Sequence, residues 1–177
     1  FDVVEHIVNR NVDTVINTIG ILHDDNHAPE KSVSYFNQDW FLNSIKVNCL
    51  TSIYMLKLLT AKLPNDSHLK FISLSARVGS IEDNQLGGWI SYRASKAALN
   101  MGLKTVAIEW HRRLKEASVV GYHPGTVDTA LSKPYQGNVK KLFSPEQAGL
   151  YLYQFSQTIT PEMSGYIYDW QQERIPF

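Results

Sequence analysis

The chain has 177 residues, of which 44% are hydrophobic and 19% are charged, as expected for a single globular domain with one substantial core. Lysine and arginine together number 17, as do aspartate and glutamate, so no basic field marks a nucleic-acid-binding protein. The sequence contains no apolar run long enough to span a bilayer.

Short apolar segments alternate with helical patterns along the first half of the chain. Residues 12–22 are apolar and β-branched, which predicts a strand buried on both faces, and the polar residues 23–39 predict a loop. From Phe41 to Leu59 apolar residues recur at helical spacing, and Pro64 follows the end of this helix. Cys49 lies on its apolar side, and a single cysteine indicates a buried thiol in a cytoplasmic protein.

The second half continues the alternation. Residues 69–76 predict a strand, a glycine-rich loop follows, and a second long helix is expected from about Ser91 to Glu116. Residues 118–123 form the next strand, SPEQ at 144–147 begins a helix that continues to about Thr158, and 165–170 form the last strand. This order predicts an α/β fold, a Rossmann-like parallel sheet with helices on both faces. Ligands then bind beyond the carboxyl ends of the strands.

The stretch SYRASKAALN, residues 91–100, places Tyr92 four residues before Lys96. On a helix these residues share one face, so the ammonium would lie beside the phenol. A nearby positive charge stabilises the phenolate, and moving a tyrosine pKa from about 10 to about 7 requires roughly 4 kcal/mol. We interpret Tyr92 as a candidate proton donor tuned by Lys96 and a bound cofactor, although this two-residue pattern also arises by chance.

Other polar residues lie near the predicted strand ends. Ser73, Ser75 and Ser80 precede Tyr92 by 12 to 19 residues, and a hydroxyl there suits either a hydrogen bond to the same substrate oxygen or the capping of backbone groups. Asn48 lies inside a predicted helix, where asparagine is unfavourable. This indicates either a role in holding a water or a lysine, or a side chain that faces solvent.

These residues resemble the short-chain dehydrogenase/reductase family over essentially the whole chain. The stretch NTIG, with Asn17 and Gly20, is similar to the family's Asn-Asn-Ala-Gly strand end. Asn48, Tyr92 and Lys96 match three members of its Asn-Ser-Tyr-Lys tetrad. The stretch HPGTVDT matches its Pro-Gly-x-Val-x-Thr motif through Pro124, Gly125, Val127 and Thr129. SARVGSIEDNQLGGWISYRASKAALN and the ending DWQQERIPF are similar to the C-factor and sniffer-like branch.

The sequence departs from the family pattern at two places. Aligned on Gly79, Ala76 occupies the usual catalytic-serine column, and we assign that role to Ser75, one residue earlier, with Ser80 as the fallback. The family opens with a Gly-x-x-x-Gly-x-Gly turn that cradles the pyrophosphate, and the ten glycines of this chain form no such pattern. We expect residues 1–177 to be one domain, the C-terminal two-thirds of the family's Rossmann domain, and to bind dinucleotide weakly by themselves.

The resemblance implies an NAD(P)-dependent oxidoreductase that transfers a hydride between a nicotinamide cofactor and a carbonyl or alcohol substrate, with NADP slightly favoured over NAD. It implies that Tyr92 is the general acid, that Lys96 lowers its pKa and binds the nicotinamide ribose, and that Ser75 orients the carbonyl. Asn48 would hold a water in a proton relay. The implied cofactor-binding residues are Asn17, Gly20, Tyr92, Lys96, Pro124, Gly125, Val127 and Thr129, the last two touching the nicotinamide carboxamide.

The resemblance also bears on loops and partners. Residues 130–143 correspond to the family's mobile substrate loop, where Leu131, Tyr135 and Leu142 either close over a substrate or pack internally. The family usually pairs through its two long helices, so we expect a homo-oligomer, a dimer or tetramer. The small residues Ala94, Ala97 and Ala98 would allow close approach. We expect a small-molecule substrate and no metal, nucleic-acid or membrane partner.

Two rival interpretations remain. One is a non-catalytic or signalling protein with this fold and a vestigial tetrad, although the presence of Asn48, Tyr92 and Lys96 together favours an enzyme. An extended-type epimerase also uses Tyr-x-x-x-Lys but needs a sizeable substrate domain after Gly125, and only 52 residues follow it.

Overall fold

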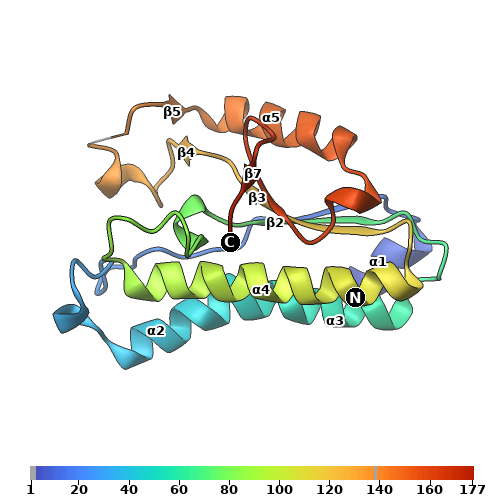
Figure 1. Ribbon diagram of the computed structural model, residues 1–177, viewed down its shortest axis with the longest axis horizontal. Coiled ribbons are helices and arrows are strands. Elements are labelled where there is room, and N and C mark those ends of the chain that lie inside the picture. The colour runs from blue at the N-terminus through green and yellow to red at the C-terminus, as the bar shows by residue number, and fades with distance from the viewer. Residues whose placement is uncertain (1–2, 138) are drawn as a thin grey trace.

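The computed structural model describes residues 3–137 and 139–177. Within them, the main sheet has five strands in the order β1-β2-β3-β6-β7. They are β1 (Thr14–Asn17), β2 (Lys70–Leu74), β3 (Ser118–His123), β6 (Ile167–Asp169) and β7 (Arg174–Ile175). The first four run parallel, and β7 is antiparallel to β6. Helices cover both faces (Figure 1), which confirms the expected α/β, Rossmann-like arrangement.

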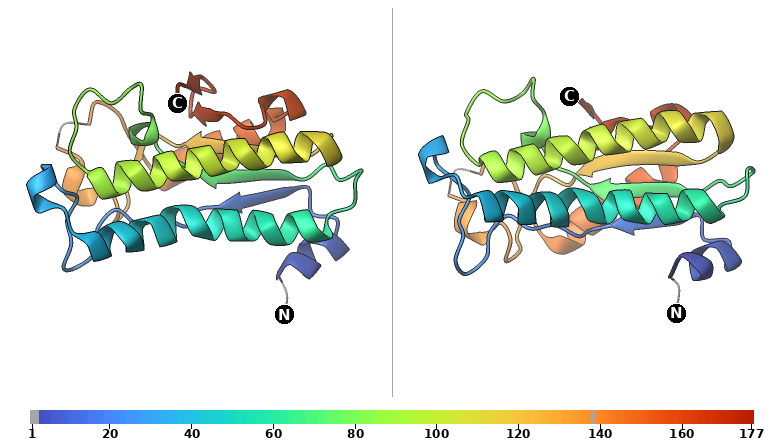
Figure 2. Two further views of the ribbon diagram at one scale, coloured as in Figure 1. Left: turned by 60° about the horizontal axis from the view of Figure 1, so that its bottom comes forward. Right: turned by 90° about the horizontal axis from the view of Figure 1, so that it is seen from below.

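The helices are α1 (Val3–Asn9), α2 (Gln38–Ile45), α3 (Thr51–Lys62), α4 (Ile90–Arg113) and α5 (Pro145–Thr158). Figure 2 shows α3 and α4 lying side by side along one face of the sheet. The two predicted long helices are therefore confirmed, but α4 ends at Arg113 rather than near Glu116. The structure also contains α1, which we did not predict from the polar sequence of residues 1–13.

Alternation along the central strands builds a core on each face, because successive side chains of a strand point to opposite sides. Phe71 of β2 and Val119 of β3 pack with buried residues of α3 and α4 such as Trp110. Their sequence neighbours Ile72 and Val120 pack on the other face with residues that include Phe155 of α5. The two layers hold the carboxyl ends of the strands in fixed positions, which is where the candidate site residues lie.

The first strand is shorter and less buried than expected. β1 covers only Thr14–Asn17 instead of residues 12–22, and Ile16 is 40% exposed. Among the described strands, only β2 pairs with β1, so β1 lies at the edge of the sheet and is not covered as a central strand would be. The residues after Asn17 leave the sheet and run toward Asn48, where backbone groups of Ile21 find side-chain partners.

The first long helix differs from expectation at its start and its centre. Asn37 caps α2 by accepting a hydrogen bond from the backbone N–H of Trp40 at 2.8 Å, so the helix begins inside the stretch predicted as a loop. Residues Lys46–Leu50 adopt a π-helical turn between α2 and α3. Such bulges are rare and are frequently found at functional sites. This one contains Asn48 and Cys49, both of them buried.

The C-terminal part carries α5 and a small second sheet. Ser144 and Gln147 form the predicted capping box at the start of α5. β4 (Thr126–Val127) pairs in parallel with β5 (Leu142–Phe143), and the residues between them include the short 3-10 helix Lys133–Tyr135. None of the helices between residues 3 and 137 or 139 and 177 combines the length and apolar character needed to cross a membrane.

Candidate active site

Helix α4 positions Tyr92 and Lys96 near the carboxyl end of β2. The Nζ atom of Lys96 lies 5.9 Å from the centroid of the Tyr92 ring, so the predicted pair shares one face of the helix. The same ammonium donates a hydrogen bond of 2.8 Å to the carbonyl of Leu74, the last residue of β2. Lys96 is 3% exposed, and this contact fixes the buried ammonium at the carboxyl end of β2.

Burial shifts both pKa values toward the neutral forms. Burial raises the pKa of Tyr92 to about 12, which is opposite to the lowering that the spacing led us to expect. Burial also lowers the pKa of Lys96 to about 8, while the neighbouring Cys49 acts in the opposite direction. At neutral pH the phenol is therefore protonated. Because neutral pH lies below the pKa of Lys96, most of the lysine side chains are charged. A proton donor and a cation lie side by side.

Asn48 holds the loop that follows β1. Its side-chain oxygen accepts from the backbone N–H of Ile21 at 2.7 Å, and its Nδ2 donates to the Ile21 carbonyl at 2.9 Å. Nδ2 also donates to the hydroxyl of Ser95 at 2.9 Å. Asn48 is 1% exposed, so the alternative of a solvent-facing asparagine is wrong. The buried amide of Asn48 therefore ties three segments together.

Gly20 completes a close group with Asn48 and Lys96. A Cβ atom at Gly20 would lie 3.4 Å from Oδ1 of Asn48 and 3.5 Å from Nζ of Lys96. Because the residue is glycine, the backbone after β1 approaches both functional groups without a side chain between them. Residues 20, 48 and 96 come from three separate segments, and the fold brings them together at the carboxyl ends of β1 and β2.

The predicted serines have other hydrogen-bonding partners. The hydroxyl of Ser75, which is buried, donates to Oδ1 of Asn100 on α4 at 2.6 Å. The hydroxyl of Ser73 lies 2.8 Å from that of Ser52. Ser80, the fallback, accepts from the backbone N–H of Asp83 at 3.1 Å. Each hydroxyl is thus engaged within the protein, and among the described residues the Ser75 hydroxyl is directed to Asn100 rather than to Tyr92.

The predicted cofactor residues on other strands occupy strand ends. Asn17 closes β1, where its side chain donates to the Ser52 hydroxyl at 2.6 Å and accepts from the N–H of Ile19 at 3.0 Å. Gly125 has a φ of 76°, and a Cβ atom there would lie 2.7 Å from the Phe143 ring. Three predicted cofactor-binding residues remain. Pro124 directly follows β3, Val127 ends β4, and Thr129 lies in the exposed segment beyond β4.

Aromatic residues near Tyr92 were mostly missed by the sequence analysis. The ring of Trp89 lies 6.3 Å from that of Tyr92 and 5.2 Å from that of Tyr135, centroid to centroid. The ring of His23 lies 5.7 Å from that of Tyr135. Tyr135 was noted only as a loop residue, and no spacing rule relates residues 23, 89 and 135. Only the folded chain brings them together.

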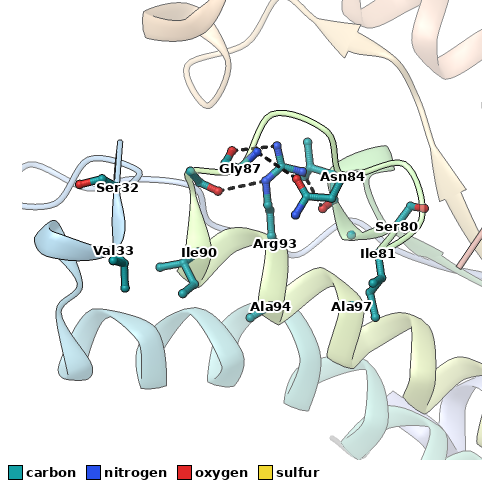
Figure 3. A pocket seen from close by; sticks show the side chains of 13 residues that line it. Ser32, Val33, Ser80, Ile81, Asn84, Gly87, Ile90, Arg93, Ala94 and Ala97 are labelled. Carbon is teal, nitrogen blue, oxygen red and sulfur yellow. Dashed lines mark hydrogen bonds between the residues drawn. The ribbon is translucent and has the colours of Figure 1, made fainter.

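A cavity of about 460 Å³ lies on another side of α4 (Figure 3). Helix residues that line it are Ile90, Arg93, Ala94 and Ala97, and the loop of residues 78–88 forms much of the remainder. Its lining includes none of Asn48, Tyr92 and Lys96, because positions 90, 94 and 97 face away from positions 92 and 96 on a helix. In the described parts of the chain, no group of three or more His, Cys, Asp or Glu residues is placed to hold a metal ion.

The fold and this group of residues agree with comparison to known proteins. A family model described as short chain dehydrogenase matches residues 2–140. The chain therefore belongs to the short-chain dehydrogenase/reductase family, and its relatives include dehydrogenases and reductases.

Two curated relatives are similar to it in sequence. 1-Hydroxy-2-glutathionyl-2-methyl-3-butene dehydrogenase of Rhodococcus sp. (strain AD45) is 32% identical over 156 residues, which cover 87% of this chain and 63% of the relative. C-signal of Myxococcus xanthus is 32% identical over 104 residues, covering 59% of this chain and 58% of the relative. The chain thus spans less than two thirds of the length of these relatives.

Solved structures show the same fold. Carbonyl reductase Sniffer of D. melanogaster superposes with a TM-score of 0.82 at 18% identity, over 99% of this chain and 72% of that one. NADPH-bound carbonyl reductase from chicken fatty liver gives a TM-score of 0.77 at 18% identity, over 98% and 71%. At these identities the likeness to solved structures shows the fold alone.

Proposed function

We propose that this chain carries the catalytic residues of an NAD(P)-dependent oxidoreductase that transfers a hydride between a nicotinamide cofactor and a carbonyl or alcohol substrate. The observation that carries the proposal is the convergence of Gly20, Asn48 and Lys96 at the carboxyl ends of β1 and β2, with Tyr92 on the same face of α4 as Lys96. Ligands of open α/β sheets bind at this edge. Membership in a family of dehydrogenases and reductases supports the same reaction type.

Tyr92 is the proposed general acid. Its pKa of about 12 keeps the phenol protonated at neutral pH, so in the reducing direction it can give its proton to the carbonyl oxygen as that oxygen gains negative charge. The ammonium of Lys96, 5.9 Å from the ring centroid, stabilises the phenolate that remains.

The surroundings of Lys96 fit the ribose of a nicotinamide cofactor. An ammonium carries three N–H donors, and in the part of the chain that the structure describes one of them donates to the Leu74 carbonyl. The other donors are suited to ribose hydroxyls, and because Gly20 has no side chain its backbone borders Nζ directly, where a Cβ atom would lie 3.5 Å away. When bound, the cofactor supplies the hydride. Structures of similar fold that contain NADP or NADPH favour NADP.

Asn48 and Ser75 need different roles from those first assigned. The amide of Asn48 is committed to Ile21 and Ser95. We therefore propose that Asn48 positions the loop around Gly20. Any relay water would then lie against the Ile21 backbone rather than against the Asn48 amide. Ser75 donates to Asn100 inside the core. For Ser75 to orient a substrate carbonyl, this hydrogen bond would first have to break.

The experiment that tests the proposal is Tyr92→Phe in the full-length protein, assayed with NADPH and NADH on a panel of carbonyl compounds. Losing a positioned general acid should lower turnover by about 10²–10⁴-fold, while cofactor affinity, measured by calorimetry, changes little. Tyr153→Phe is the matched control, because Tyr153 is exposed on α5. Near-native turnover in the Tyr92 variant would show that the proton comes from elsewhere.

Two observations favour a second candidate function. C-signal matches 104 residues at 32% identity, and the usual serine position is Ala76 here. We therefore keep a non-catalytic or signalling role as the alternative. Turnover of any compound in the carbonyl panel, lost with Tyr92→Phe, would decide for the enzyme.

Pairing of two copies through the long helices remains a proposal, and sedimentation analysis tests it.

A further inference from the structure

The residues before α4 adopt an unusual backbone. Gly87, Gly88 and Trp89 all have positive φ values, of 64°, 64° and 56°. Glycine occupies this left-handed region freely, but a residue with a bulky side chain does so at a cost. A strained residue persists only where its surroundings hold it, and such residues concentrate at functional sites. The position of Trp89 therefore calls for an explanation.

Two residues, Glu30 and Arg93, hold this segment in place. The backbone N–H of Trp89 donates to the carbonyl of Glu30 at 2.5 Å, and the Glu30 carboxylate, in a residue only 4% exposed, accepts from both the N–H and the hydroxyl of Ser91. From the next turn of α4, Arg93 donates to the carbonyls of Gly88 at 3.0 Å and Gly87 at 3.2 Å (Figure 3). The turn is thus tied on both sides, which fixes the backbone that carries the indole.

The indole points to the candidate active site. It meets the Tyr92 ring edge-to-face at 6.3 Å and the Tyr135 ring edge-to-face at 5.2 Å. Tyr135 in turn meets His23 at 5.7 Å. The side chains of these four residues are half-buried, so each ring keeps a surface that another molecule can contact.

A second link fixes the outer end of this row of rings. The Nε2 atom of His23 lies 3.1 Å from the carbonyl of Leu131, so the loop after β1 and the segment that carries Tyr135 are joined. Burial also raises the pKa of Tyr135, and its phenol therefore stays neutral. Beyond Tyr92, the row consists of Trp89, Tyr135 and His23. These three residues present aromatic faces and edges and carry neither a carboxylate nor an ammonium group.

We infer that Trp89, Tyr135 and His23 form an aromatic wall beside Tyr92 that selects carbonyl substrates bearing an aromatic ring. The inference rests on the proposed function for the identity of the reacting group, while the wall itself rests on the ring geometry. An aryl group placed against such a wall gains offset-stacked or edge-to-face contacts that an aliphatic group of equal size does not. Glu30 and Arg93 are positioning residues, because they act through the backbone of the Trp89 turn.

The test compares two ketones of similar size, acetophenone and cyclohexyl methyl ketone, whose dissociation constants for the 177-residue chain are measured by NMR titration. Each ring contact should favour acetophenone by about two- to tenfold. Trp89→Leu and Tyr135→Leu should each reduce this preference, and Trp89→Phe should restore much of it. Tyr153→Leu, an exposed tyrosine on α5, should leave it unchanged. Circular dichroism melting checks that each variant is folded.

The outcomes separate this inference from the proposed function. Equal affinity for the two ketones, binding of neither, or a preference that survives in both leucine variants would overturn the aromatic wall. If NADPH-dependent reduction is seen with both ketones at equal efficiency, the oxidoreductase proposal stands and the wall is refuted. If acetophenone is preferred and the leucine variants lose that preference, the wall is supported even where no ketone is reduced, and the failure then belongs to the proposed function.

Discussion

Replacing Lys96 by methionine tests how strongly the candidate site is desolvated. Lys96 is 3% exposed, and burial lowers its pKa from 10.5 to about 8, with Cys49 acting in the opposite direction. Methionine has a flexible, unbranched side chain that fills most of the same space without a charge. The variant removes the hydrogen bond to the Leu74 carbonyl, which costs about 1–3 kcal/mol at every pH if the carbonyl finds no other donor.

The pH dependence of stability isolates the buried charge. Below pH 8 the folded and unfolded chains both keep the lysine proton, so Lys96 adds no pH dependence there. Between pH 8 and 10.5 the unfolded chain keeps the proton and the folded chain has released it. The unfolded state then binds more protons, and stability rises with pH. From about pH 7 to about pH 10, the native protein should gain about 2–3 kcal/mol relative to the variant.

Urea unfolding followed by circular dichroism at several values in that pH range measures this difference directly. The raised pKa of the Cys49 thiol acts in the opposite sense, but Cys49 is present in both proteins and largely cancels in the comparison. Lys115→Met is the matched control, since Lys115 is exposed and its replacement should leave the pH profile unchanged. A constant difference between native protein and K96M across the range would refute the claim that the ammonium is desolvated.

Three further substitutions test contacts around the site. Ser75→Ala leaves the Asn100 oxygen without its donor, so we expect a loss of about 1–3 kcal/mol in urea unfolding; a change in turnover larger than tenfold would instead support the catalytic role first assigned to Ser75. Gly125→Ala places a Cβ atom 2.7 Å from the Phe143 ring at a φ of 76°, and thermal unfolding should show a loss of more than about 1 kcal/mol. Glu30→Ala removes the acceptor at the start of α4 and should cost about 1–3 kcal/mol, whereas an unchanged melting temperature would contradict its holding role.

The protonation states of the pair agree with one direction of the proposed reaction. A phenol with a pKa of about 12 and a lysine with a pKa of about 8 are, at neutral pH, a proton donor beside a cation. Reduction of a carbonyl needs this combination, whereas oxidation of an alcohol needs the phenolate. The sequence led us to expect a lowered tyrosine pKa because proximity of a charge was the only effect visible there. In the folded chain desolvation acts on both groups and works against the charged form of each.

Local sequence rules determined much of this protein. The period of apolar residues predicted both long helices, and short apolar runs predicted the central strands. The four-residue spacing of Tyr92 and Lys96 put both on one face, because a helix has the same geometry wherever it occurs. The capping box at Ser144 is likewise confirmed, since all its hydrogen bonds lie within four residues.

Tertiary structure decided the features that depend on segments far apart in the chain. The Asn48 amide is engaged because the backbone of Ile21 lies within 2.7 Å of its side-chain oxygen, and Ser75 is engaged because Asn100 of α4 lies within 2.6 Å of its hydroxyl. The strained turn at Trp89 is held by Glu30, 59 residues earlier in the sequence, and its ring meets Tyr135, 46 residues later. Spacing rules describe neighbours along one helix or strand, whereas hydrogen bonding and desolvation in the core depend on which elements the sheet brings together.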